Sequence, residues 1–156
     1  MSGASADVRV GFFMYSHVLV PLENSPADDT VLAHVAKLVQ KSGARVSLIH
    51  VADGYVARNY DQLKLAPSQE MLEDVEYLKK RESELQSLNI VTSAHLAWGE
   101  PADEIIKFAE EIQCDLIAMA THGHGLVADF VLGSVTRSVR HRTNIPVLLI
   151  RSCHKS

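Results

Sequence analysis

The chain has 156 residues, of which 47% are hydrophobic and 22% charged, as is typical of a globular protein with one domain of ordinary size. Its formal net charge of −4 lacks the basic excess of a nucleic-acid-binding protein, so we expect no nucleic-acid partner. No apolar run reaches the length of about 18 residues that a membrane span needs, and two cysteines without a Cys-x-x-Cys motif fit a reducing compartment, so we expect a cytoplasmic protein with no membrane partner.

The composition along the chain predicts one domain over residues 16–152, between an N-terminal tail of residues 1–15 and a C-terminal tail of residues 153–156. A short apolar stretch, residues 10–15, follows the single cation Arg9. This stretch is too short for a convincing signal peptide, and we interpret it as part of the tail.

The first predicted elements are a strand, His17–Leu22, and a helix that begins near Pro26. Asn24 and Ser25 are capping residues, and proline suits the first helical position. Gly43 is placed to end this helix. Its apolar residues recur on one helical face at Val31, Val35, Leu38 and Val39.

The second strand, Arg45–Val51, is nearly continuous in apolar residues, as in a strand covered on both faces. The segment Asp53–Pro67 shows neither a helical nor a strand period and predicts a long loop, a type of segment that is often functional. Ser68 then caps a helix whose apolar stripe comprises Met71, Val75, Leu78 and Leu85.

The second half of the chain continues the alternation of strands and helices. Pro101 begins a helix with Asp103 and Glu104 in its first turn, which favours the helix dipole. The other predicted elements are the strand Ile90–Trp98, the strand Asp115–Ala120, a helix Gly133–Arg142 capped by Ser134, and the strand Pro146–Arg151.

Five strands alternating with four helices predict parallel pairing with right-handed crossovers, and so an α/β fold with a doubly wound sheet. Ligands of such sheets bind beyond the carboxyl ends of the strands, where the strand order reverses. We therefore expect the segments Pro21–Asn24, Val51–Asp53 and Ala120–Gly125 to converge.

The segment Cys114–Val135 carries the strongest functional signal. It runs from a strand through a glycine-containing turn, Thr121–Gly125, to the helix that begins at Gly133-Ser134. Such a junction presents free backbone N–H groups and the positive end of a helix dipole, which suit a phosphate. On spacing alone, however, Gly133-Ser134 is better interpreted as an ordinary helix start.

Other candidate groups have simpler interpretations. His122 and His124 lack a third metal ligand and are better interpreted as turn residues. Glu23 has no paired carboxylate or nucleophile, which favours a ribose contact or a solvated strand end over a general base. The pair Asp28-Asp29 lies inside the first helix, which argues against a phospho-receiver site. Three histidines without visible partners are interpreted as core-edge residues: His34, His50 and His95.

The chain resembles the universal stress protein family over essentially all of residues 16–151. The resemblance rests on HVLVPLENS, SLIHV, WGEPADEIIKFAEEIQCDLIAMATHG, LGSVTRSV and NIPVLLIR. It implies a Rossmann-like fold of the adenine nucleotide alpha hydrolase type, with a five-stranded parallel sheet of order 3-2-1-4-5. It also implies a homodimer formed through the fifth strand, with Val147, Leu148, Leu149 and Ile150 at the interface.

One branch of that family binds ATP through the pattern G-x2-G-x9-G-[ST]. Gly123, Gly133 and Ser134 match this pattern at the correct spacing, whereas Ala120 replaces the first glycine. Glu23 stands where the family usually has an aspartate and keeps the carboxylate one methylene further out.

The resemblance implies a site for ATP, ADP or AMP, with Mg²⁺ as a candidate companion of the phosphates. The P-loop pattern GxxxxGK[ST] is absent from the sequence, so backbone dipoles would meet most of the phosphate charge. The adenosine would contact Pro21, Leu22, Glu23 and Val51, with Met119 and Ala120 as the floor. The phosphates would be held by His122, Gly123, Gly133, Ser134 and Val135.

The sequence thus predicts an adenine-nucleotide-binding regulatory or stress-response module. No catalytic constellation or metal site is visible, so we expect at most slow ATP hydrolysis. The alternative is a nucleotide-free dimeric interaction protein of the same fold, motivated by Ala120 and Glu23. Its protein partners, which the sequence does not identify, would bind at the Asp53–Pro67 loop or at the dimer surface.

Overall fold

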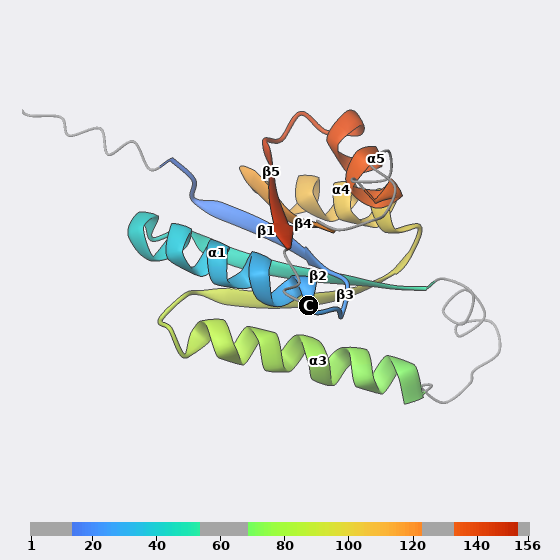
Figure 1. Ribbon diagram of the computed structural model, residues 1–156, viewed down its shortest axis with the longest axis horizontal. Coiled ribbons are helices and arrows are strands. Elements are labelled where there is room, and N and C mark those ends of the chain that lie inside the picture. The colour runs from blue at the N-terminus through green and yellow to red at the C-terminus, as the bar shows by residue number, and fades with distance from the viewer. Residues whose placement is uncertain (1–13, 54–68, 123–132, 153–156) are drawn as a thin grey trace, which may run out of the picture.

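A parallel sheet of five strands forms the centre of the computed structural model, which describes residues 14–53, 69–122 and 133–152. The strands are β1 (His17–Leu22), β2 (Arg45–Asp53), β3 (Thr92–Gly99), β4 (Leu116–His122) and β5 (Val147–Ser152). Their order is β3-β2-β1-β4-β5, which confirms the predicted topology (Figure 1).

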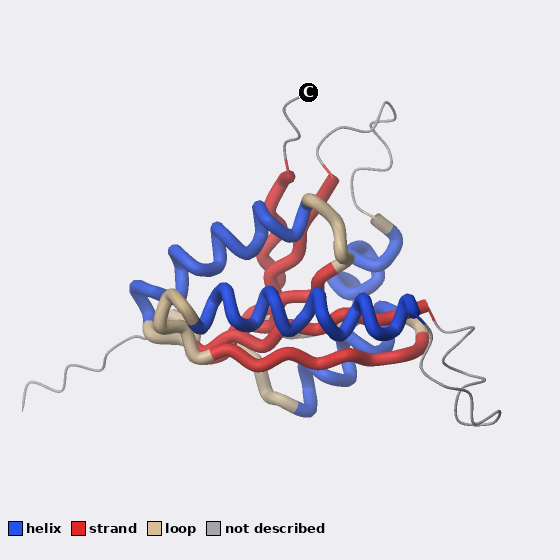
Figure 2. The backbone as a smooth tube through the Cα atoms, turned by 90° about the horizontal axis from the view of Figure 1, so that it is seen from below, coloured by secondary structure: helices blue, strands red, loops and turns tan. Residues whose placement is uncertain are grey.

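The sheet lies between two layers of helices. The helices are α1 (Ala27–Ser42), α3 (Gln69–Gln86), α4 (Pro101–Glu111) and α5 (Ser134–Arg142). Helices α1 and α3 cover one face of the sheet, and α4 and α5 cover the other (Figures 1 and 2). This doubly wound arrangement follows from right-handed crossovers on both sides of β1.

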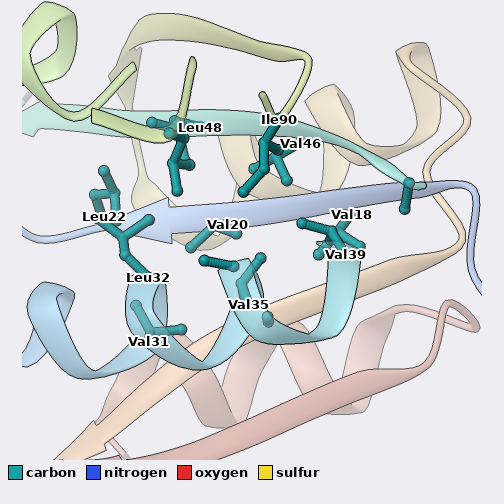
Figure 3. Packing of buried hydrophobic residues seen from close by; sticks show 14 of the residues in the cluster. Val18, Val20, Leu22, Val31, Leu32, Val35, Val39, Val46, Leu48 and Ile90 are labelled. Carbon is teal, nitrogen blue, oxygen red and sulfur yellow. The ribbon is translucent and has the colours of Figure 1, made fainter. Parts of the chain in front are cut away.

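Strand β1 is buried along its whole length because it lies at the centre of the sheet between the two layers. Val18, Val20 and Leu22 point toward α1 (Figure 3). Leu19 points the other way, into the core beneath α4. A strand covered on both faces needs apolar residues without alternation, which explains the continuous run in the sequence.

Two helix boundaries agree with the sequence signals. Gly43 ends α1 with a φ of 71°, and its N–H donates to the Val39 carbonyl at 2.7 Å. A left-handed φ costs glycine little, which is why it stops the helix there. At the start of α4, the Glu100 carboxylate accepts from the Asp103 N–H at 2.8 Å, and Pro101 follows as the first helical residue.

Two predicted caps are wrong. Pro26 occupies the N-cap position of α1, and the hydroxyl oxygen of Ser25 is buried without a hydrogen-bond partner in the described structure. The Asp28 carboxylate binds the backbone of the preceding turn instead. At α5 the cap position is Gly133, with no side-chain hydrogen bond, and Ser134 is the first helical residue.

Strand β4 continues beyond its predicted end at Ala120. Thr121 and His122 pair with Arg151 and Ser152 of β5, so they belong to the sheet and not to the predicted turn. Strand β2 likewise extends to Asp53, where it pairs with the end of β3. The longer ladders satisfy backbone groups that a turn would leave to other partners.

The C-terminal strand β5 lies at an edge of the sheet, as predicted. Val147, Leu148 and Leu149 are partly buried, and Ile150 is buried. The predicted loop after Asp53 and most of the two predicted tails lie outside the described residues, so the domain boundaries remain predictions. None of the helices in the described ranges combines the length and apolar character needed to cross a membrane.

Candidate functional site

A cavity of about 410 Å³ opens beyond the carboxyl ends of the central strands. Parallel strands bring these ends to one edge of the sheet. The strand order reverses between β1 and β4, so the cavity lies at the topological switch point of the fold. The cavity is lined by Pro21, Leu22, Glu23, Asn24, Asp28, Ile49, His50, Val51, Ala52, Glu70, Asp74, Pro101, Ile105, Met119, Ala120 and Val135.

Most of the predicted site residues meet at this cavity. They are Pro21, Leu22 and Glu23 of the β1 end, Val51 of β2, Met119 and Ala120 of β4, and Val135 of α5. His122 ends β4, and Gly133 and Ser134 begin α5, but none of these residues is part of the lining. Gly123 lies outside the described residues.

The turn after β1 is held by a carboxylate from inside α1. Asp28 is 1% exposed and accepts from the Glu23 N–H at 3.1 Å and from the Ser25 N–H at 3.2 Å. Within this turn Asn24 adopts a φ of 57°, which asparagine tolerates better than most residues. The Asp28 carboxylate therefore fixes the backbone of the turn after β1, where Glu23 and Asn24 line the cavity.

A third donor reaches the same carboxylate from the other helix of this layer. The Tyr77 hydroxyl of α3 donates to Asp28 Oδ2. Burial, and then the hydrogen bond and charge of Asp28, raise the pKa of Tyr77, so the phenol stays protonated and keeps donating. Asp28 is thus a buried anion that is satisfied by neutral donors.

His50 joins the cavity to α3, which corrects its interpretation as a residue without partners. Its Nδ1 lies 2.8 Å from the Leu22 carbonyl oxygen, and its Nε2 lies 3.3 Å from Asp74 Oδ1. A carbonyl oxygen only accepts, so Nδ1 carries a proton. When Nε2 is protonated as well, His50 and Asp74 form an ion pair whose side chains are 12% and 10% exposed.

His95 also has a partner, away from the cavity. Its ring stacks on Phe108 of α4, with centroids 4.3 Å apart and an interplanar angle of 10°. The predicted absence of a partner was therefore wrong for this histidine too. No signal in the local sequence places two rings from β3 and α4 together.

The lining residues that the sequence analysis did not name as site residues come from the start of α1 and the turn before it, from β2, from α3 and from α4: Asn24, Asp28, Ile49, His50, Ala52, Glu70, Asp74, Pro101 and Ile105. Asp28 carried a readable signal, because it lies three and four residues before Val31 and Leu32 and so shares the apolar face of α1. An acid on such a face must be paired. Asp74 carried the same signal, because it lies three residues after Met71 and four before Leu78 on the apolar stripe of α3. Glu70 is exposed and offered no comparable signal.

The lining is acidic and holds no lysine or arginine among the described residues. Its carboxylates are Glu23, Asp28, Glu70 and Asp74. The described lining residues include no serine, threonine or cysteine, and the described part of the chain has no group of three side chains arranged to hold a metal ion. The described cavity is therefore equipped to bind and orient a ligand by hydrogen bonds and apolar contact.

Comparison with known proteins gives a consistent result. A sequence model of the universal stress protein family matches residues 14–151. The chain is 28% identical over 158 residues to the universal stress protein MJ0577 of Methanocaldococcus jannaschii. This alignment covers 88% of this chain and 96% of that protein. It is 31% identical over 150 residues to a universal stress protein of Methanothermobacter thermautotrophicus, with 89% and 97% of the chains covered.

The fold is shared with solved structures of such proteins. The structure of MJ0577 superposes with a TM-score of 0.74 and 28% identity, covering 91% of this chain and 99% of that chain. A universal stress protein of Archaeoglobus fulgidus, solved in complex with dAMP, superposes with a TM-score of 0.66 at 24% identity, covering 87% of this chain and 98% of that chain.

Proposed function

Because the chain belongs to the universal stress protein family, we propose that its cavity binds an adenine nucleotide and that the protein acts as a nucleotide-responsive regulatory module. The observation that carries the proposal is the convergence of the β1, β2 and β4 ends with Val135 of α5 around one cavity. The fold is also one in which the Archaeoglobus fulgidus protein holds dAMP.

In the proposed complex the nucleoside fills the cavity. Glu23 accepts from the ribose hydroxyls, and Val51, Met119 and Ala120 contact the base. Ala120 is only partly buried and lines the cavity, so its methyl group narrows the floor without filling it. A volume of about 410 Å³ is within the range of small-molecule sites.

The phosphates leave the cavity toward the start of α5. The first turns of α1, α3 and α4 carry acidic residues, whereas the first turn of α5 has none. The free N–H groups after Gly133 and the helix dipole therefore face no competing carboxylate within their own turn. Mg²⁺ would accompany a triphosphate and carry part of its charge.

The proposed role is regulatory or protective in a stress response, with at most slow hydrolysis of ATP. The module is a cytoplasmic homodimer joined through β5. Its signal to further protein partners is the difference between the nucleotide-bound and the empty cavity.

Calorimetric titration with Mg-ATP, ADP and AMP tests the nucleotide proposal. We expect binding to the wild type and a loss of at least about tenfold in affinity in Ala120→Leu, because the added side chain occupies the cavity floor. Ala33→Leu is the matched control, since Ala33 is exposed on α1 away from the cavity. No binding of any adenine nucleotide, and none carried through purification, would instead favour the nucleotide-free interaction protein.

A further inference from the structure

The cavity wall has a definite charge pattern, which follows from the hydrogen bonds of its carboxylates. Asp28 is bound by two backbone N–H groups and the Tyr77 hydroxyl, all of them neutral donors, so its negative charge is not cancelled. Asp74 has a lining partner that can carry positive charge, His50. Glu23 and Glu70 add two further carboxylates to the lining.

Arg81, on the same side of the molecule, does not neutralise these carboxylates. Arg81 lies 2.5 Å from Asp29 and 3.0 Å from Glu84, and neither of these acids lines the cavity. Arg137 lies in the first turn of α5 and is likewise outside the lining. Among the described residues the lining therefore holds more negative than positive groups even when His50 is protonated.

We propose that this acidic lining makes the cavity select adenine ligands by their charge, so that adenosine and the monophosphate bind more tightly than free triphosphate. The inference rests on the proposed function and specifies the ligand class of the same cavity. ATP then binds chiefly together with a divalent cation, which reduces its charge before the carboxylates meet it.

The expected size of the effect follows from Coulomb's law. One carboxylate and one phosphate charge about 10 Å apart in water repel enough to change an equilibrium constant about twofold. Several such pairs acting together give a difference of about tenfold between adenosine and free ATP. At low ionic strength the repulsion extends furthest, because the Debye length is about 30 Å at 0.01 M salt and about 3 Å at 1 M.

The sign of the salt dependence separates this site from one built around lysine or arginine. At a cationic phosphate site, added salt weakens ATP binding by screening attraction. Here added salt screens repulsion, so free ATP should bind more tightly as salt rises, while uncharged adenosine should change little. This readout does not depend on which atoms contact the phosphates.

The experiment titrates the full-length protein with adenosine, AMP and ATP in EDTA, and with ATP in excess Mg²⁺, at low and high salt. We expect free ATP to bind about tenfold more weakly than adenosine at low salt. Mg²⁺ or high salt should reduce this difference in affinity. Free ATP binding tighter than adenosine and weakening with salt would overturn the charge selection while leaving nucleotide binding intact. It would mean that the α5 start and Arg137 outweigh the carboxylates.

Two variants that each remove one negative charge give a second readout. Glu70→Gln removes one lining carboxylate and should improve the affinity for free ATP relative to adenosine about twofold at low salt. Glu76→Gln is the matched control, an exposed acid on α3 outside the lining. Equal effects of the two variants would contradict the proposal. No binding of adenosine, AMP or ATP would overturn both the charge selection and the proposed function.

Discussion

The Tyr77 hydroxyl donates to the Asp28 carboxylate, so a residue in the middle of α3 is joined to the first turn of α1. The same carboxylate binds the backbone N–H groups of Glu23 and Ser25. One buried anion therefore ties together both helices of a layer and the turn that forms a rim of the cavity. Loss of the Asp28 carboxylate should therefore both lower the stability of the fold and change the shape of the cavity.

Tyr77→Phe removes one hydrogen-bond donor from the Asp28 carboxylate, together with the weaker contact of the same hydroxyl with Arg81. We expect the free energy of unfolding to fall by about 1.5–3 kcal/mol, the usual range for a hydrogen bond to a charged group. Urea unfolding measures this. Tyr15→Phe serves as control, because the Tyr15 hydroxyl has no hydrogen-bond partner in the described structure, and similar losses in the two variants would contradict the assignment.

Asp115 should make the protein sensitive to acid. Burial raises the pKa of Asp115, but hydrogen bonds from the Ser16 N–H and hydroxyl, both at 2.8 Å, and from the His17 N–H at 3.0 Å lower it further than burial raises it. The pKa therefore lies below the ordinary value of 3.8. Since the folded state binds this proton more weakly than the unfolded state, the stabilisation is complete above that value and is lost as the pH falls through the lowered pKa.

Chemical unfolding at a series of pH values tests this for Asp115→Asn. We expect the variant to be less stable by about 1–2 kcal/mol near pH 6, with the difference from wild type shrinking below about pH 4. Glu110→Gln, an exposed acid at the end of α4, should follow the wild type throughout. A difference for Asp115→Asn that stays constant with pH would show that the lost contacts act independently of the charge.

Cys114 should be an inert thiol in the folded protein. Burial raises the pKa of Cys114 to about 11, and the nearby charge of Asp115 adds to the effect. The thiolate is the reactive form, so we expect alkylation by iodoacetamide at pH 8 to be about 100-fold slower than for a free thiol. The measurement uses a Cys153→Ser background so that only Cys114 reports. Unfolding in urea should restore the ordinary rate, and equally fast modification of the folded protein would contradict the prediction.

The proposed homodimer through β5 is tested at Val147, the first residue of that strand. Val147→Lys places a charge among the apolar residues of the edge, and we expect it to convert a dimer into a monomer in light scattering coupled to gel filtration. Val91→Lys is the control, because Val91 is 74% exposed next to β3, at the opposite edge of the sheet. Circular dichroism checks that both variants are folded. A wild type that is monomeric at all concentrations would exclude the interface.

The sheet and its order could be predicted because they depend on local patterns that repeat along the chain. Short apolar runs such as His17–Leu22 and helix signals such as Gly43 and Pro101 each act within a few residues. Much of the predicted cavity lining was found for the same reason, since the ends of parallel strands meet at one edge. Seven of the predicted residues line the cavity: Pro21, Leu22, Glu23, Val51, Met119, Ala120 and Val135.

The cavity wall from α3 could not be predicted in this way. Asp74 reaches His50 across 24 residues of chain, and Tyr77 reaches Asp28 across 49. Such contacts depend on how α3 is placed against the sheet, which no local periodicity specifies. The wrong cap at Ser25 has a different, local cause, because Asp28, three residues later, binds the backbone of that turn. At α5 no side chain makes a capping hydrogen bond in the described structure.

The contact between His50 and Asp74 also has a consequence for how the chain tolerates change in length. These two side chains lie 3.3 Å apart at their closest atoms, on either side of the sequence that links β2 to α3. Once they are in contact, the linking sequence has fixed ends, and its closure entropy grows only with the logarithm of its length, at about 0.6 kcal/mol for each doubling. Insertions between β2 and α3 should therefore cost little stability and leave His50 and Asp74 in contact.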